Sequence, residues 1–179
     1  MIFTRCWAMP NADTFSIKPI KEFVKRYLSK SRVSVDPFAR NKRWATHTND
    51  LNPATLAEHH LDAEEFVYLL RDNNKSADLV LFDPPYSPRQ ISECYKGIGL
   101  EVGMKETQSA LLYQRVRNAI DTILEGDGIV LSFGWNSVGM GISRGFELIE
   151  VFLVCHGGAH NDTICIAEKK VKNNQANLL

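Results

Sequence analysis

Apolar residues recur with helical spacing in three stretches of the chain. In the first stretch, Pro19 falls in the opening turn, where its missing N–H has no helical partner to lose. The second stretch begins with Asp62, followed three positions later by Glu65, which is typical of a capping box at a helix N-terminus. The predicted helices cover residues 17–28, 63–70 and 110–124, and a short helix is also expected to end at His60.

Short apolar runs, bounded by proline, glycine or polar residues, predict the strands of a sheet. They alternate with the helices, and the last two are joined by a glycine-rich turn over residues 155–162. This order predicts an α/β fold with a doubly wound, mostly parallel sheet and a late antiparallel strand. Residues 87–108 have weak periodicity and are expected to form a long loop with one short helix. The predicted strands cover residues 32–36, 46–50, 78–82, 128–133, 146–154 and 163–167.

The length of 179 residues suits one domain, which we expect over residues 1–170, with a disordered tail over residues 171–179. No apolar run approaches the roughly 20 residues that a membrane-spanning helix needs. The N-terminus lacks the basic start and long apolar core of a signal peptide. The four cysteines are far apart and form no C-x-x-C pair, so reduced thiols in a cytoplasmic protein are expected.

Charge is unevenly distributed, although the whole chain is neutral. Residues 18–43 contain nine basic and two acidic residues, which gives this segment a net charge of +7 and leaves the remainder at −7. A one-sided basic segment is compatible with contacts to the phosphates of a nucleic acid, and equally with a solvated helix face. The sequence leaves both interpretations open.

The tetrapeptide Asp83-Pro84-Pro85-Tyr86 directly follows the apolar run 79–82. Two consecutive prolines fix φ and remove two backbone donors, so the predicted strand has to stop there and the turn after it is stiff. Their carbonyl groups stay free to accept hydrogen bonds. A rigid group of acceptors beside an aromatic ring suits a site that holds a planar amine by its N–H groups and stacks on its face.

Three further aspartates, Asp36, Asp50 and Asp62, lie at or just past the ends of predicted strands. A single aspartate after a strand is usually a helix cap or a turn residue. In an open α/β sheet, however, ligands bind beyond the carboxyl ends of the strands. Four acidic residues in such positions, with Asp83 as the fourth, therefore indicate a ligand site.

With these motifs the chain resembles the class I methyltransferases that use S-adenosylmethionine, in particular the adenine-specific (N6) DNA methyltransferases of the small phage or prophage type. The resemblance covers nearly the whole chain, from about Phe15 to Ala167. Asp83 to Tyr86 match the family's catalytic D-P-P-Y motif. The implied fold is the Rossmann-like, doubly wound sheet of that class, and the implied cofactor is S-adenosylmethionine.

The resemblance implies direct methyl transfer to an exocyclic amine, without a covalent intermediate. The Asp83 side chain and the Pro84 carbonyl would accept hydrogen bonds from the amine and increase the electron density on its nitrogen. Pro85 completes the rigid turn. Tyr86 would stack on a base flipped out of the nucleic acid.

The resemblance also implies a set of cofactor-binding residues. Asp36, Pro37 and Phe38 correspond to the start of the first cofactor motif, which usually reads D-P-F-x-G-x-G. Phe15 and Lys18 bound the segment expected to pack against the methionine end of the cofactor.

The adenosine end of the cofactor has its own implied contacts. Asp50 corresponds to the acidic residue that bonds the ribose hydroxyls. Asp62 and Ala63 correspond to the residues that pair with the cofactor's adenine amine.

The first cofactor motif departs from the family pattern in two ways. Arg40, Asn41 and Lys42 stand where a G-x-G would let the backbone approach the cofactor. Only 14 positions separate Asp36 from Asp50, too few for a crossover helix and a strand. Either the helix is lost and the cofactor pocket is abbreviated, or cofactor binding is weak or requires a partner.

No segment is large enough for a separate target-recognition domain, so relaxed or short-site specificity for DNA is expected. The alternatives are an amino-methyltransferase acting on guanine or adenine in RNA, and a non-catalytic, methyltransferase-like nucleic-acid-binding subunit. The sequence leaves open whether the chain forms a homodimer. The loop after the tetrapeptide and the glycine-rich turn are expected to supply the nucleic-acid contacts, with Ser87, Arg89, Lys96, His160 and Asn161 as the candidates.

Two other groups of residues carry weaker signals. His156 and His160 lie four residues apart in a glycine-rich turn without a further ligand nearby, so no metal site is expected. Trp44 and Trp135 could stack on a base, but packing in the core or at its rim is the favoured interpretation for both.

Overall fold

The computed structural model describes residues 1–99, 109–158 and 160–171. Its centre is a seven-stranded sheet with the order β1-β6-β7-β5-β4-β2-β3, in which only β7 runs antiparallel to its neighbours. The prediction of a mostly parallel sheet with a late antiparallel strand is thereby confirmed. The strands are β1 (Ile2–Trp7), β2 (Ser34–Asp36), β3 (His47–Thr48), β4 (Ala77–Phe82), β5 (Leu124–Gly134), β6 (Phe146–Cys155) and β7 (Thr163–Lys170).

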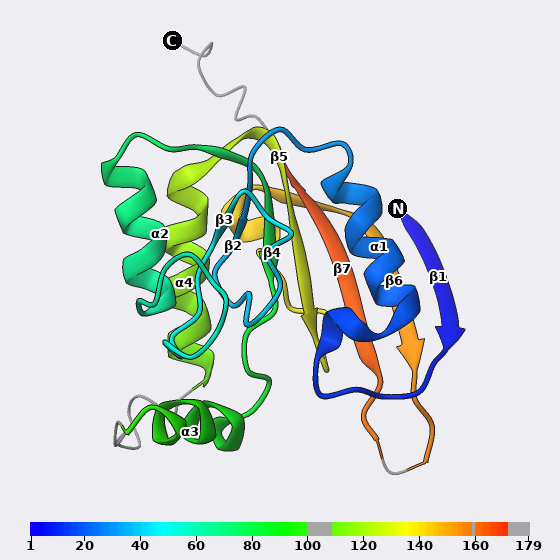
Figure 1. The fold of residues 1–179 in the computed structure, drawn as a ribbon. Helices are drawn as coiled ribbons and strands as arrows, with labels where there is room; N and C mark the ends of the chain where they lie inside the picture. The colour runs from blue at the N-terminus through cyan, green and yellow to red at the C-terminus, as the bar shows by residue number, and fades with distance from the viewer. Residues whose placement is uncertain (100–108, 159, 172–179) are drawn as a thin grey trace, which may run out of the picture.

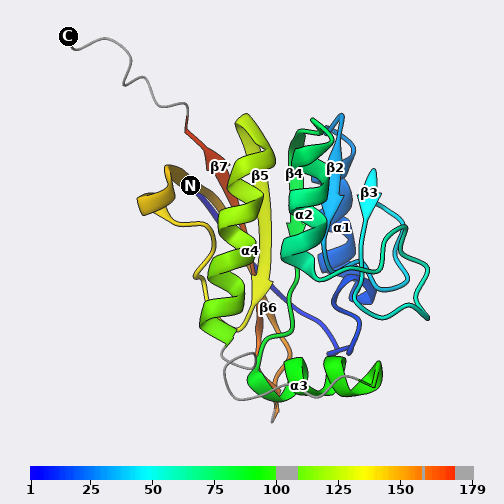
Figure 2. The ribbon, with the colours of Figure 1, turned by 90° about the vertical axis from the view of Figure 1, so that its left-hand side faces the viewer.

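Helices cover both faces of the sheet, with α1 on one face and α2 and α4 on the other (Figures 1 and 2). The fourth helix of the described residues, α3, lies past the carboxyl ends of the parallel strands. Within the described ranges, no helix is long and apolar enough to cross a membrane. The helices are α1 (Lys18–Leu28), α2 (Ala63–Asp72), α3 (Pro88–Gly97) and α4 (Ser109–Ile123), with 3-10 turns at Thr14–Ser16 and Ile142–Arg144.

One sequence prediction about helices is wrong and another is confirmed. No helix ends at His60, because residues 51–60 form turns in which the Asn52 side chain and carbonyl accept bonds from the N–H of Ala54 and Thr55. The short helix expected after the tetrapeptide is α3, which takes up ten residues of that segment. The rest of that segment, 100–108, and the predicted tail beyond Val171 lie outside the described residues.

The core lies in two layers, one on each side of the sheet. In β4, Leu79 and Leu81 pack toward the layer of α1, whereas Val80 and Phe82 pack toward α2 and α4. Successive side chains of a strand point to opposite faces, so a strand buried on both sides is apolar at nearly every position. This explains why the run before Asp83 reads as continuously hydrophobic.

The connection from β2 to β3 contains no helix, as the short spacing predicts. The two strands nevertheless pair in parallel, Val35 with His47 and Asp36 with Thr48. A further parallel bridge joins Asn49 to His59 and extends the sheet briefly beyond β3. The shortened connection therefore preserves the strand direction and keeps the carboxyl ends of β2, β3 and β4 at one edge.

Strand β1 was not predicted from the sequence. It pairs in parallel with β6 at the edge of the sheet, from Ile2 opposite Glu150 to Trp7 opposite Cys155. Most of its side chains are exposed, so its sequence lacks the buried stripe on which a periodicity argument depends. Its pairing partner is also about 148 positions away in the chain, and a local sequence pattern cannot predict a pairing over such a separation.

The two-layer core generates a stability prediction. Phe66 of α2 is fully buried, so Phe66→Ala is expected to lower the free energy of unfolding by about 3–5 kcal/mol through lost burial and a cavity. Urea denaturation followed by circular dichroism measures this change. Leu56→Ala is the control, since Leu56 is 63% exposed, and its effect is expected to stay within about 0.5 kcal/mol. A loss below about 1 kcal/mol for Phe66→Ala would contradict the assigned packing.

Candidate active site

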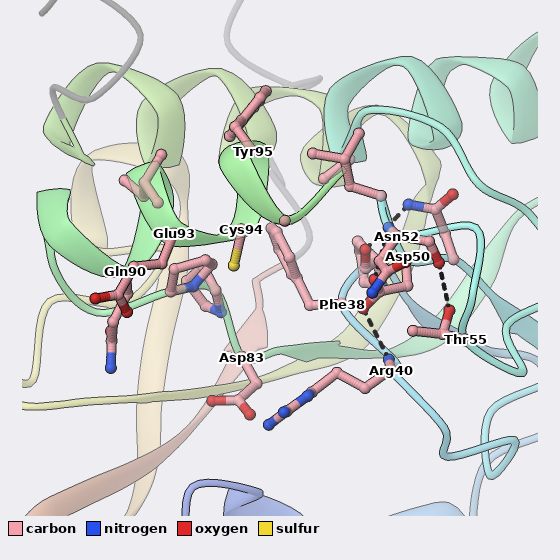
Figure 3. A pocket seen from close by; sticks show the side chains of 18 of the residues that line it. Phe38, Arg40, Asp50, Asn52, Thr55, Asp83, Gln90, Glu93, Cys94 and Tyr95 are labelled. Atoms are coloured by element: carbon pink, nitrogen blue, oxygen red, sulfur yellow. Dashed lines mark hydrogen bonds between the residues drawn. The ribbon is translucent and has the colours of Figure 1, made fainter. Parts of the chain in front are cut away.

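The carboxyl ends of β2, β3 and β4 border a cavity of about 620 Å³ (Figure 3). Residues of α3, among them Ile91, Cys94 and Tyr95, form another wall of this cavity. Nine of the residues singled out in the sequence line it together, although they come from four separate segments. They are Pro37, Phe38, Asp50, Asp62, Ala63, Asp83, Pro84, Pro85 and Tyr86.

The tetrapeptide is held rigidly where β4 ends. The Tyr86 hydroxyl donates to Asp83 Oδ1 at 2.5 Å and also forms a hydrogen bond with Thr14 Oγ1 at 3.1 Å. The Tyr86 N–H donates to Gln90 Oε1 at 2.6 Å, which ties the turn to α3. Ser87 caps that helix by accepting from the Gln90 N–H at 3.3 Å. The turn, the helix and the segment around Thr14 thus fix one another.

The Asp83 carboxyl lies on the cavity wall in a partly desolvated environment. Its removal from water raises its pKa to about 6, against the opposing effects of hydrogen bonds from Tyr86 and Thr14 and the nearby Arg40 charge. Burial and the adjacent Asp83 also raise the pKa of the Tyr86 hydroxyl well above its usual value. Tyr86 is therefore a neutral donor at physiological pH, whereas Asp83 is an acid that titrates just below it.

Asp50 reaches the cavity from the end of β3 with both carboxylate oxygens already oriented. Asp50 Oδ2 accepts from the Arg40 N–H at 3.0 Å, and Oδ1 accepts from the Asn52 N–H at 2.9 Å. Each carboxylate oxygen can accept two hydrogen bonds, so capacity for a ligand remains. Two backbone N–H groups thus fix the orientation of the Asp50 side chain and leave acceptor capacity on both of its oxygens.

Asp62 is the N-cap of α2, where its Oδ1 accepts from the Glu64 N–H at 2.9 Å. Its other oxygen, Oδ2, accepts from the Tyr95 hydroxyl of α3 at 3.2 Å. Asp62 consequently links the helix that begins at the cavity with the helix that covers it. Sequence reasoning identified the cap and missed Tyr95, whose segment lacks clear periodicity.

Arg40 adopts the backbone conformation that the missing glycines would favour. Its φ is +50°, in the left-handed region, where a residue with a Cβ is disfavoured by roughly 1–2 kcal/mol. Its guanidinium donates to the Ala12 carbonyl at 2.7 Å, and its side chain extends toward Asp83 (Figure 3). The tight turn of the motif is thus retained, and a cation is added to the cavity wall.

Asn49 is a structural residue of the site that the sequence did not reveal. It is fully buried, and its Nδ2 donates to the carbonyls of Pro37 and Leu61 at 3.1 and 3.0 Å. Its Oδ1 accepts from the Leu61 N–H at 2.9 Å. The side chain therefore joins the loop after β2 to the segment that leads into α2.

Three of the predicted cofactor contacts lie outside the cavity lining. Asp36 is buried behind it and accepts from the Phe38 N–H at 3.0 Å, while burial, reinforced by the nearby Asp83 and Asp50, raises its pKa well above the usual value. Phe15 packs inside the core against an aromatic cluster. Lys18 is the exposed first residue of α1. Asp36 shapes the turn that carries Phe38.

The predicted nucleic-acid contacts fall into two groups. Ser87, Arg89 and Lys96 belong to α3 or its cap, with Arg89 engaged in an ion pair within the helix. His160 and Asn161 lie elsewhere, on a second cavity of about 320 Å³ that also borders Tyr86. Ser87 follows Tyr86 directly in the chain, whereas of the five candidates only His160 and Asn161 line the second cavity beside Tyr86.

The chain matches no protein-family model and no curated protein in sequence, whereas its structure resembles several solved ones. TrmN from Thermus thermophilus is 16% identical over 87% of this chain and 49% of that protein, with a TM-score of 0.57. NSun6 from Pyrococcus horikoshii, solved with SFG, is 16% identical over 83% and 50%, with a TM-score of 0.55.

A third similar structure is the N-methyltransferase NodS from Bradyrhizobium japonicum WM9 in complex with S-adenosyl-l-homocysteine. It is 7% identical over 86% of both chains, with a TM-score of 0.54. The chain spans about half the length of TrmN and NSun6. At these identities the similarity is one of fold. Together with the sheet order and the antiparallel β7, it shows that the chain has the Rossmann-like fold of the class I methyltransferases.

Proposed function

We propose that this chain transfers a methyl group from S-adenosylmethionine to the exocyclic amino group of adenine in DNA. One observation carries the proposal: Asp83-Pro84-Pro85-Tyr86 ends β4 in the wall of a cavity that also contains Asp50 and Asp62. The tetrapeptide matches the catalytic motif of the amino-methylating family described above. The fold shared with an N-methyltransferase solved with S-adenosyl-l-homocysteine supports the same assignment.

The residues of the larger cavity fit the proposed cofactor. Its volume of about 620 Å³ lies within the usual range for pockets that bind small molecules, about 300–1,000 Å³. Asp50 and Asp62 offer carboxylate oxygens to hydroxyl and amine donors, and Phe38 offers an aromatic face. The residues that would hold the cofactor are Pro37, Phe38, Asp50, Asp62 and Ala63. Pro37 and Phe38 lie on the loop after β2, which has a left-handed turn at Arg40 without glycine.

The chemistry follows from the position of Asp83. When bound, S-adenosylmethionine would supply a sulfonium methyl group to the amine nitrogen, with S-adenosyl-l-homocysteine as the leaving group and the amine proton passing to water. The ionised Asp83 carboxylate and the Pro84 carbonyl accept the amine N–H groups and raise the electron density on nitrogen. The bond from Tyr86 uses only part of the acceptor capacity of Asp83.

The expectation from the sequence, a small enzyme of relaxed or short-site specificity and of the phage or prophage type, is part of this proposal. Two alternatives are separated by experiment. An RNA amino-methyltransferase would use the same residues on another nucleic acid. A non-catalytic binding subunit would retain the fold without binding the cofactor.

Cofactor binding is the first test. Titration calorimetry with S-adenosylmethionine is expected to show binding by the wild-type chain. Asp50→Ala is expected to weaken it about tenfold or more, because a charged hydrogen-bond acceptor is lost from the cavity. Asp72→Ala, at the exposed end of α2, is the matched control and should leave the affinity unchanged. Absence of binding at millimolar cofactor, with and without DNA, would favour the non-catalytic subunit.

Methyl transfer is the second test. Incubation with labelled cofactor is expected to label adenine in DNA, and Asp83→Ala is expected to lower kcat about 100-fold by removing the acceptor at the reacting amine. Affinity of this variant for the cofactor should remain within about threefold of wild type, since the lost group faces the amine. Label found in RNA but not in DNA would overturn the DNA assignment and support the RNA alternative.

The pH dependence gives an independent test of Asp83. Its raised pKa of about 6 means that the carboxylate is ionised above this pH and becomes a neutral acid below it. The single-turnover rate is therefore expected to be level near pH 8 and to decline below about pH 6, approaching tenfold per pH unit. Asp83→Asn does not titrate, so its rate should lack this decline. An unchanged profile in Asp83→Asn would assign the titration to another group.

A further inference from the structure

The second cavity adjoins the first across the tetrapeptide. Four residues line both cavities, namely Ala12, Thr14, Tyr86 and Gln90. Tyr86 is thus part of the boundary between a cavity of about 620 Å³ and one of about 320 Å³. A transfer between two molecules requires two adjoining sites, and this boundary carries the side chain that directly contacts Asp83.

Trp135 gives the smaller cavity an aromatic wall. It follows β5 directly, lines the cavity and remains 43% exposed, so the predicted core or rim packing leaves much of its ring uncovered. Its ring centroid lies 5.6 Å from that of Tyr86, at an interplanar angle of 67°. Two rings at this angle form a corner, in which a third planar ring can stack on one and meet the other with its edge.

The smaller cavity is also lined by polar side chains. His156 Nδ1 lies 2.8 Å from the Ala8 carbonyl, which can only accept, so this nitrogen carries the hydrogen. In the neutral ring, Nε2 then accepts from the Thr163 hydroxyl at 2.9 Å. The Thr163 oxygen and the side chain of Asn161 consequently present hydrogen-bonding groups on the cavity wall.

The walls of the smaller cavity are fixed by the N-terminal segment. The Ala8 N–H donates to the Cys155 carbonyl at 3.0 Å, the Ala12 carbonyl accepts from Arg40, and Thr14 bonds to Tyr86. These contacts fix residues 8–14, which include Ala12 and Thr14 of the shared lining. The site is therefore built before a ligand arrives, which limits the entropy lost on binding.

We propose that the smaller cavity binds the planar heteroaromatic ring of the acceptor, a purine base, and that Trp135 is a positioning residue for that ring. The inference rests on the proposed function, because it places the acceptor next to Asp83. An aromatic corner together with hydrogen-bonding groups in the same cavity matches a base, which has two flat faces and polar edges. The volume of about 320 Å³ is at the small end for ligand sites, as suits a single base.

The test compares two oligodeoxynucleotides that differ only in the candidate ring. One is a fluorescently labelled single strand of thymidines with one central adenine, and the other has an abasic site at that position. Binding is measured by fluorescence anisotropy in the presence of S-adenosyl-l-homocysteine, so contacts to phosphates contribute equally to both. The wild-type chain is expected to bind the adenine strand about tenfold more tightly than the abasic strand.

Trp135→Ala is expected to remove most of this difference, with little change in affinity for the abasic strand. Trp135→Phe should restore most of it, since a flat ring returns to the corner. Trp7→Ala is the matched control, because Trp7 is 63% exposed on β1 and lies outside the lining of both cavities. Thermal unfolding by circular dichroism establishes that all three variants are folded.

Turnover kinetics distinguish the failure of this inference from failure of the proposed function. Trp135→Ala is expected to raise the KM for the nucleic acid about tenfold while cofactor affinity stays unchanged. A wild-type chain that methylates DNA, together with a Trp135→Ala variant of unchanged KM and an unchanged adenine-to-abasic ratio, would overturn this inference alone. A wild-type chain that neither binds the cofactor nor methylates any nucleic acid would overturn both. The same comparison of an adenine strand with an abasic strand, made with RNA, identifies which nucleic acid supplies the base. If neither the DNA pair nor the RNA pair shows tighter binding of the adenine strand, the proposal is contradicted.

Discussion

The buried amide of Asn49 is the interaction on which the rest of the site depends. It joins the loop after β2 to the entry of α2 through three hydrogen bonds. An amide that is fully buried has to satisfy its donors and acceptor within the protein, so the positions of its partners are closely constrained. Phe38 and Asp62 adjoin those partners, and Asp50 adjoins Asn49 itself, so all three are brought to one cavity.

A second constraint acts at Asp83, where burial and hydrogen bonding oppose each other. Desolvation favours the neutral acid, while the Tyr86 hydroxyl, Thr14 and the Arg40 cation favour the carboxylate. The balance leaves a group that changes its charge near neutrality, in contrast to Asp36, whose burial lacks a compensating cation. Two aspartates that look equivalent in the sequence therefore differ in chemistry: one is exposed to the cavity and the other supports a turn.

The sequence was sufficient for the parts of the fold that repeat a local pattern. The strand that ends before Asp83 can be predicted from its continuous run of apolar residues, and the helix capped by Asp62 from its capping residues. Both signals lie in residues that are neighbours in the chain. The helix α3 was underestimated because only Ile91 is buried among its residues, so no apolar stripe marks it. Asn49 and Trp135 could not be found in this way, since their importance comes from partners in distant segments.

The same reasoning explains which predicted site residues the structure brings together. Those that follow the ends of β2, β3 and β4 meet at the cavity, because parallel strands present their carboxyl ends at one edge of the sheet, whereas Asp36, the last residue of β2 itself, is buried behind the cavity. Phe15 and Lys18 were placed by resemblance along a segment whose register the sequence does not determine. Ala12 and Thr14, a few residues earlier in the chain, line the cavity instead.

The pairing of β1 with β6 has a consequence for the order of folding. Ile2 lies opposite Glu150, so β1 has no partner until synthesis has proceeded as far as β6. Contacts between residues so distant in the chain form late, because the long loop between them must close first. Residues 8–14 depend on that pairing for their anchor at Cys155. The boundary between the two cavities is therefore among the last parts of the molecule to be assembled, and a nascent chain carries the tetrapeptide without the site around it.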